Sequence, residues 1–195
     1  MAVSRVAIAN RALTKLGAAR VIALDDDNEA SNTIESMFDI VRDAELRASL
    51  WHFSKARVQL PALSDAPAFG FSHQFQLPAD YLRLIQVGDV RVWPRPQVEG
   101  WYSIEAGRIL INHTGPLNVR YVQRVEDTTA FDALFVEAFA CRLAVEACET
   151  LTNSNTKKQG LWEEYLQAMT TARRANAIER PAVTPSNDTW LEARN

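Results

Sequence analysis

The sequence is poor in the residues that bind metals or form disulfide bonds. It has three histidines and two cysteines in 195 residues. His52, His73 and His113 fall in different predicted elements, and none has a metal-ligand spacing to another histidine or cysteine. Cys141 and Cys148 lie two turns apart in one helical pattern, which is too far for a disulfide. We therefore expect structural histidines and reduced thiols that fill core volume, as in an intracellular product.

Glycine is also scarce, and the glycine-containing motifs of nucleotide binding and hydrolysis are missing from the sequence. It contains no GxxxxGK[ST], GxGxxG or GxSxG. The three aspartates at 25–27 lack the alternate spacing and the distal glutamate of a calcium loop, so helix capping explains them more simply. No pair of nucleophile and base is recognisable either. We expect neither an enzyme nor a protein with a metal or cofactor.

Long apolar runs are absent. None approaches the roughly 20 residues that a membrane span needs, and residues 1–17 are too polar for a signal peptide. Hydrophobic residues make up 47% and charged residues 23% of the chain, which is ordinary for a globular domain. We expect no membrane partner.

Charge is unevenly distributed, although the net charge is only −3. Residues 1–24 carry four basic and no acidic side chains, and residues 25–49 carry eight acidic against two basic ones. Residues 83–124 carry six arginines against three acids, and residues 125–150 carry six acids against one arginine. Two interpretations remain open: solvated surfaces of mixed sign, or complementary surfaces on neighbouring copies of one chain.

Helical periodicity dominates both ends of the chain. We predict helices over 2–16, ended by Gly17, and over 25–53, capped by Asp26 or Asp27. A third helix, capped by Thr128 or Thr129, runs to about 152, and a fourth runs from about 155 to 178. The apolar positions of the fourth are Trp162, Tyr165, Leu166, Met169 and Ala172. Trp51 and Phe53 are expected to be buried at the junction with the middle third of the chain.

The middle third alternates like short strands punctuated by Gly and Pro, which predicts an antiparallel meander. The predicted class is therefore α+β, mainly α, with a four-helix core and an inserted antiparallel β lobe. The core would comprise residues 1–60 and 126–180, and the lobe residues 61–125. Residues 181–195 would form an extended C-terminal tail.

Several segments in series resemble one known family. They are ALTKLGAARVIALDDDNEAS at 12–31, VRDAELRASLWHFSKARVQL at 41–60, HQFQLPADYLRLIQV at 73–87, GRILINHTGPLNVRYVQRVEDTTAFDALFVEAFACRLAVEAC at 107–148 and DTWLEARN at 188–195. Together they resemble the phage head-to-tail adaptors, the tail tubular protein A proteins of short-tailed phages.

This resemblance implies a non-enzymatic virion protein, made in the host cytoplasm and located in the neck of the tail. Such adaptors form a homo-oligomeric ring, here expected to be a dodecamer, between the portal protein and the tail nozzle protein. The ring continues the channel for double-stranded DNA without binding a specific sequence. By the same resemblance, the portal contact falls on Trp190, Leu191 and Arg194, and the tail contact on Trp93, Arg95 and Val98.

A ring of identical chains needs two different patches that fit each other. The charge blocks would supply them, with Arg83, Arg91, Arg108, Arg120 and Arg124 facing acids such as Asp39, Asp43 and Glu137. An acidic lumen would let DNA slide, because Lys and Arg contacts to phosphate dominate non-specific affinity. The main alternative is a nucleic-acid-binding ring subunit of a DNA-packaging apparatus. A small hydrolase is a further alternative, without a recognisable catalytic pair.

Overall fold

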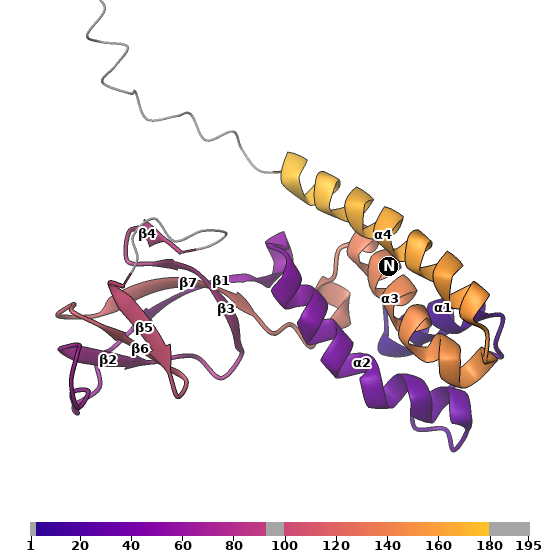
Figure 1. Cartoon of the computed structure of the whole chain (residues 1–195), viewed down its shortest axis with the longest axis horizontal. Coiled ribbons are helices and arrows are strands. Elements are labelled where there is room, and N and C mark those ends of the chain that lie inside the picture. The colour runs from indigo at the N-terminus through magenta and orange to yellow at the C-terminus, as the bar shows by residue number, and fades with distance from the viewer. Residues whose placement is uncertain (1–2, 93–99, 180–195) are drawn as a thin grey trace, which may run out of the picture.

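Amphipathic helices build one lobe of the elongated molecule and short strands build the other (Figure 1). The computed structural model describes residues 3–92 and 100–179. The chain is α+β and mainly α, which confirms the predicted class. The helices are α1 Arg5–Leu16, α2 Glu29–Ala48, α3 Ala133–Thr152 and α4 Asn155–Ile178.

The end of α1 agrees with the sequence pattern. Gly17 adopts a left-handed conformation with φ +67°, and its N–H closes the last turn. Only glycine does so without a steric penalty, so it terminates helices readily. The start is later than predicted, because the Ser4 hydroxyl accepts a hydrogen bond from the N–H of Ala7 and caps the helix.

Helix α2 is shorter than predicted at both ends. Asn28, rather than Asp26 or Asp27, caps it by accepting the N–H of Ser31 at 2.9 Å. The Asp26 carboxylate instead accepts the backbone N–H groups of Ile22 and Ala23. The sequence has three adjacent capping side chains at 26–28. Because Asp26 closes a turn with Ile22 and Ala23, the helix begins after Asn28 instead.

Trp51 lies beyond the end of α2 and is 1% exposed, as predicted. Its indole N–H donates to the carbonyl of Glu45 at 3.1 Å and its ring meets Phe135 edge-on at 4.9 Å between centroids. Phe53, in a short 3-10 helix at His52–Ser54, is only partly buried against the same core. These rings close the helical lobe where the chain passes into the first strand.

Helix α3 is the centre of the helical lobe and packs against α1, α2 and α4. Asp132 caps it through the N–H groups of Leu134 and Phe135, so capping by Thr128 or Thr129 was wrong. No helix in the two described stretches has both the length and the hydropathy to cross a membrane.

On α4, Tyr165, Met169 and Ala172 are buried as predicted, but Trp162 and Leu166 are 42% and 48% exposed. The buried stripe also includes Leu161. Trp162 and Leu166 each follow a stripe residue directly, so they lie about 100° further around the helix, outside the packed face.

The strands form two antiparallel sheets. They are β1 Lys55–Leu60, β2 His73–Gln76, β3 Tyr81–Val87, β4 Val90–Arg91, β5 Tyr102–Glu105, β6 Arg108–Ile111 and β7 Leu117–Gln123. One sheet has the order β1-β7-β3-β4 and the other β2-β6-β5. The pairing is antiparallel as predicted, but the simple meander was wrong, because β7 returns to lie between β1 and β3.

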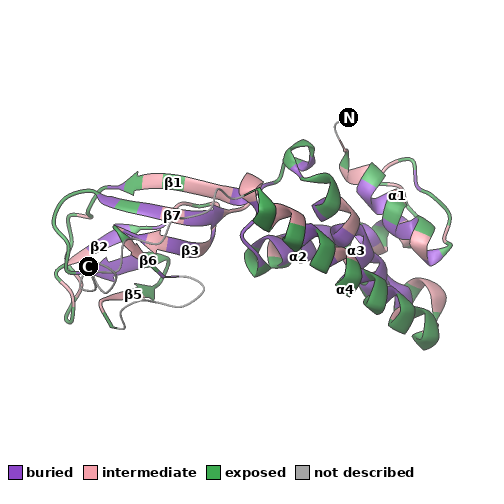
Figure 2. Cartoon of the chain, turned by 90° about the horizontal axis from the view of Figure 1, so that it is seen from above, coloured by how far each residue is buried: buried purple, intermediate pink, exposed green. Residues whose placement is uncertain are grey.

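Strand β1 falls within residues 1–60, which the sequence assigned to the helical core. It pairs with β7 over its full length, so the sheet begins at Lys55 rather than after residue 60. The two sheets share an apolar core that includes Phe75, Ile109 and Val119. The opposite face of the four-stranded sheet is polar, and β1 carries half-buried and exposed residues along most of its length (Figure 2).

Candidate functional site

A row of arginines crosses the polar face of the four-stranded sheet. Arg57 on β1 is the direct cross-strand neighbour of Arg120 on β7. On the other side of β7, Arg120 is opposite Gln86 on β3. Gln86 is in turn opposite Arg91 on β4. Residues directly opposite each other in adjacent strands project from the same face. We call Arg57, Arg120 and Arg91 the arginine row; Gln86 lies between its second and third members.

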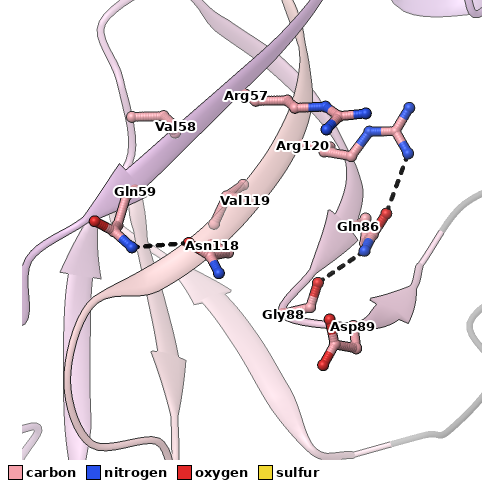
Figure 3. A pocket seen from close by; sticks show the side chains of 9 residues that line it. All are labelled: Arg57, Val58, Gln59, Gln86, Gly88, Asp89, Asn118, Val119 and Arg120. Atoms are coloured by element: carbon pink, nitrogen blue, oxygen red, sulfur yellow. Dashed lines mark hydrogen bonds between the residues drawn. The ribbon is translucent and has the colours of Figure 1, made fainter.

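Hydrogen bonds order the middle of this row (Figure 3). Arg120 Nη1 donates to Gln86 Oε1 at 3.3 Å, and Gln86 Nε2 donates to the carbonyl of Gly88 at 2.8 Å. The Arg57 side chain runs beside that of Arg120, so two guanidinium groups end close together (Figure 3). The result is a pre-ordered pair of cationic groups at the surface.

A shallow depression of about 390 Å³ lies along this part of the sheet. Its rim continues past the arginines to Gln59, whose amide donates to Asn118 Oδ1 at 3.1 Å. Asp89, in the turn between β3 and β4, contributes the one carboxylate among the described residues that line the depression. Amide and guanidinium donors therefore outnumber acids here.

The row brings positive charges together on one face of the sheet. Within residues 3–92 and 100–179, neither Arg57 nor Arg91 has a carboxylate within ion-pair distance. Lys55 and Arg83 lie on the same face nearer the helical lobe, where both are opposite Val122 of β7. Burial, and then the charge of Arg47, lower the pKa of Arg83.

The acids proposed for contacts between copies are engaged within the chain. Asp39 accepts hydrogen bonds from Arg5 at 2.9 Å and from Arg42 at 2.8 Å. Asp43 pairs with Arg42 and, at 2.7 Å, with Arg124, another of the interface candidates. The Arg124–Asp43 pair thus links the end of the β lobe to α2.

Glu137, the third acid, belongs to a clamp across three helices. Arg11 Nε on α1 donates to it at 2.9 Å, and Lys15 Nζ at 2.7 Å. Lys15 also pairs with Glu164 on α4. The hydrogen bond from Arg11, with further contributions from Lys15, outweighs burial and lowers the pKa of Glu137 to about 2.

Glu137, Glu164 and Cys141 bring potential metal-ligand atoms within 4.8 Å of one another. The ammonium group of Lys15 already lies among the two carboxylates and supplies the positive charge. Burial raises the pKa of the Cys141 thiol, which disfavours the thiolate that a metal would need. This cluster is therefore best explained as a structural ion-pair network.

Arg108, the remaining interface candidate, lies apart from the arginine row. It belongs to β6 in the other sheet, where its Nη1 donates to Gln74 Oε1 at 3.1 Å. The structure thus brings together Arg91 and Arg120 on one open face, with Arg83 nearby, and separates Arg108 and Arg124 from them. The candidates Trp93, Arg95, Val98, Trp190, Leu191 and Arg194 lie outside the described residues.

Sequence reasoning missed Arg57. It precedes the arginine-rich segment 83–124, and only the long-range pairing of β1 with β7 places it beside Arg120. Alternation in the segment 55–60 was the one available signal, and it indicates a face but not a neighbour.

A second exposed feature lies on α4. Trp162 and Leu166 project from its outer side, and the Arg142 guanidinium lies 5.2 Å from the Trp162 ring centroid. A shallow depression beside Trp162 is lined by Val145 and by polar residues of α4. We call Trp162 and Leu166 the α4 apolar patch.

A buried carboxylate underlies this side of the helical lobe. Glu45 on α2 is 5% exposed and accepts the hydroxyl of Tyr165 at 2.8 Å. Arg142 Nε lies 3.8 Å from the same carboxylate oxygen. Burial raises the pKa of Glu45 despite these partners, so the group is part of the core rather than of the surface.

Comparisons of this chain with models of known protein families and with curated protein sequences found no match.

Proposed function

We propose that this chain is a structural subunit of a phage head-to-tail adaptor, a ring between the portal and the tail nozzle that continues the DNA channel. The family resemblance of the sequence supports this function. Four of the segments that carry it fall in well-defined parts of the fold. They run from α1 into α2 (12–31), from α2 through β1 (41–60), through β2 and β3 (73–87), and from β6 through most of α3 (107–148).

The observation that carries the proposal is the α4 apolar patch. Trp162 and Leu166 are 42% and 48% exposed on neighbouring turns of one face of α4. Exposed apolar residues that cluster beside a depression are typical of contact sites. Tryptophan is also among the residues that contribute most to interface energy. We therefore assign this patch to the contact between neighbouring subunits.

Ion pairs are less suited to that contact. Asp39, Asp43 and Glu137 already have cationic partners within the chain. To meet a neighbouring copy they would first have to give up these partners. Burial of apolar surface is then the main driving force for ring formation.

The test is the mass of the purified protein, alone and mixed with its portal, by light scattering coupled to size exclusion. The native chain should form a ring in at least one of these conditions. Trp162→Ser combined with Leu166→Ser should abolish assembly and leave the secondary structure unchanged. Ile40→Ser is the matched control, because Ile40 is a 73% exposed apolar residue on α2. A chain that stays monomeric in both conditions, or a double variant that assembles normally, would contradict the proposal.

The arginine row favours one alternative, a nucleic-acid-binding ring subunit of a DNA-packaging apparatus. Such a subunit must hold DNA, whereas an adaptor must let it pass. The alternative predicts firm DNA retention at physiological salt and no affinity for the portal.

A further inference from the structure

We infer that the arginine row is a contact site for the phosphate backbone of double-stranded DNA. The inference deepens the proposed function, on which it rests for the presence of DNA near the protein. Arg57 and Arg91 are exposed, and Arg120 is held half-buried by Gln86. The row therefore presents three permanently charged donors at one surface.

One anion can contact two members of the row. Arg57 and Arg120 are direct cross-strand neighbours, and their guanidinium groups end close together (Figure 3). A phosphate between the two groups would accept hydrogen bonds from both. Arginine suits this ligand because its planar fork matches the geometry of phosphate oxygens.

The shape of the face indicates duplex backbone rather than bases. Four strands spaced by about 4.8 Å span about 14 Å, which exceeds the roughly 12 Å width of the major groove. The sheet would therefore lie across the backbone rather than enter the groove. The neighbouring Gln59 and Asn118 add amide donors, which are common phosphate contacts.

Single-stranded nucleic acid fits less well. Proteins that bind it stack the bases on aromatic side chains. Within the described part of the chain, the residues that line the depression include no aromatic ring. The aromatic residues of β3 and β7, Tyr81 and Tyr121, belong to the opposite, apolar face.

The acidic surface of a second copy is also a weaker candidate. The acids of α2 and α3 that would serve as partners are paired within their own chain, as Asp43 is with Arg124. DNA, in contrast, carries one negative charge for about every 1.7 Å of duplex, neutralised by mobile counterions that a binding protein releases. Asp89 at the end of the depression would repel phosphate, so the contact is centred on Arg57 and Arg120.

The experiment measures fluorescence anisotropy of a short labelled duplex of mixed sequence as a function of salt. Three phosphate contacts per chain predict a log–log slope of about −2.7, which is about a 40-fold loss of affinity between about 50 and 200 mM salt. Arg57→Gln combined with Arg120→Gln should reduce the slope to about one third, a loss of only about 3- to 4-fold over the same range. Asp89→Asn should bind more tightly than the native chain.

Arg20→Gln combined with Arg174→Gln is the matched control, because both arginines are exposed and lie outside the sheet. It removes the same charge and should keep the native slope. The row variant should also remain folded by circular dichroism, since neither Arg57 nor Arg120 belongs to the apolar core. If it does not, Arg91→Gln alone should lower the magnitude of the slope by about 0.9.

Three outcomes would overturn the inference. The first is no DNA binding at low salt, and the second is an equal loss of DNA affinity in the row variant and the control variant. The third is a row variant that binds DNA normally but loses the contact between copies. The portal assay is independent of this one. A chain that assembles but does not bind DNA overturns this inference alone. A chain that binds DNA but never assembles overturns the proposed adaptor function.

Discussion

Trp51 should be among the most destabilising positions to truncate in the helical lobe. The side chain is 1% exposed and contacts the rings of Phe135 and Phe53 at centroid distances of 4.9 and 6.2 Å. Replacing a buried tryptophan by alanine costs about 3–5 kcal/mol through lost transfer energy and the cavity left behind. The aromatic pairs contribute about 0.5–1.5 kcal/mol each beyond the buried area. We therefore expect Trp51→Ala to lower the free energy of unfolding by about 5 kcal/mol, the upper end of that range.

A second contribution comes from the indole N–H. Its hydrogen bond to the carbonyl of Glu45 satisfies one of the last four carbonyls of α2, which have no partner within the helix. Trp51→Phe keeps most of the ring packing and removes this donor. It should cost about 1–2 kcal/mol, mainly for the unsatisfied buried carbonyl.

The measurement is urea unfolding followed by circular dichroism, at concentrations where the midpoint does not depend on protein concentration. A fall in the midpoint at constant m-value reports a change of stability. Trp162→Ala is the matched control, because that ring is 42% exposed on α4 and should cost about 1 kcal/mol or less. The expected order of destabilisation is Trp51→Ala, then Trp51→Phe, then Trp162→Ala. A loss below about 1 kcal/mol for Trp51→Ala, or the reverse order, would refute the packing described above.

Three further predictions concern the charges and the termini. The pKa of Glu137 is lowered to about 2 from a usual 4.5, so its pairing stabilises the fold above pH 4.5 and is lost as the pH falls toward 2. The native chain and Lys15→Met should therefore differ less in unfolding free energy as the pH falls over that interval. Urea titrations at several pH values measure this difference. Assembly through the α4 apolar patch should depend little on salt, as measured by light scattering, whereas a steep loss of rings with salt would restore an electrostatic contact between copies. Residues 186–195 hold the apolar pair Trp190 and Leu191 in an otherwise polar segment. Their deletion should leave the melting temperature nearly unchanged and abolish portal binding. A truncated chain that is destabilised, or that still binds the portal normally, would rule out the tail as the portal anchor.

The helices were predictable because their signals are local. Apolar positions three and four residues apart placed all four helices, and Gly17 marked the end of α1. Their boundaries depended on competition between adjacent polar residues. Asp26, Asp27 and Asn28 all suit a cap, and the choice of Asn28 followed from the turn that Asp26 makes with Ile22. Such choices depend on tertiary context more than on propensity.

The arrangement of the strands was not predictable in the same way. Alternation identified most strands and their apolar faces, but the order β1-β7-β3-β4 depends on which edges meet in space. The candidate site could not be predicted for the same reason, because Arg57 and Arg120 become neighbours only through the register of β1 against β7. A shift of that register by one residue would send them to opposite faces.

The ion pairs of the helical lobe explain much of the uneven charge of the chain, and they separate the arginine row from the α4 apolar patch. The basic side chains of α1 pair with acids of α2 and α3 within the helical lobe, as Arg5 does with Asp39 and Arg11 with Glu137. In the proposed adaptor, the α4 apolar patch would contact the neighbouring copy through burial of apolar surface. The arginine row would contact DNA, and that contact would weaken as the salt concentration rises. Firm subunit contacts combined with weak phosphate contacts are what a channel needs if it is to stay assembled while DNA moves through it.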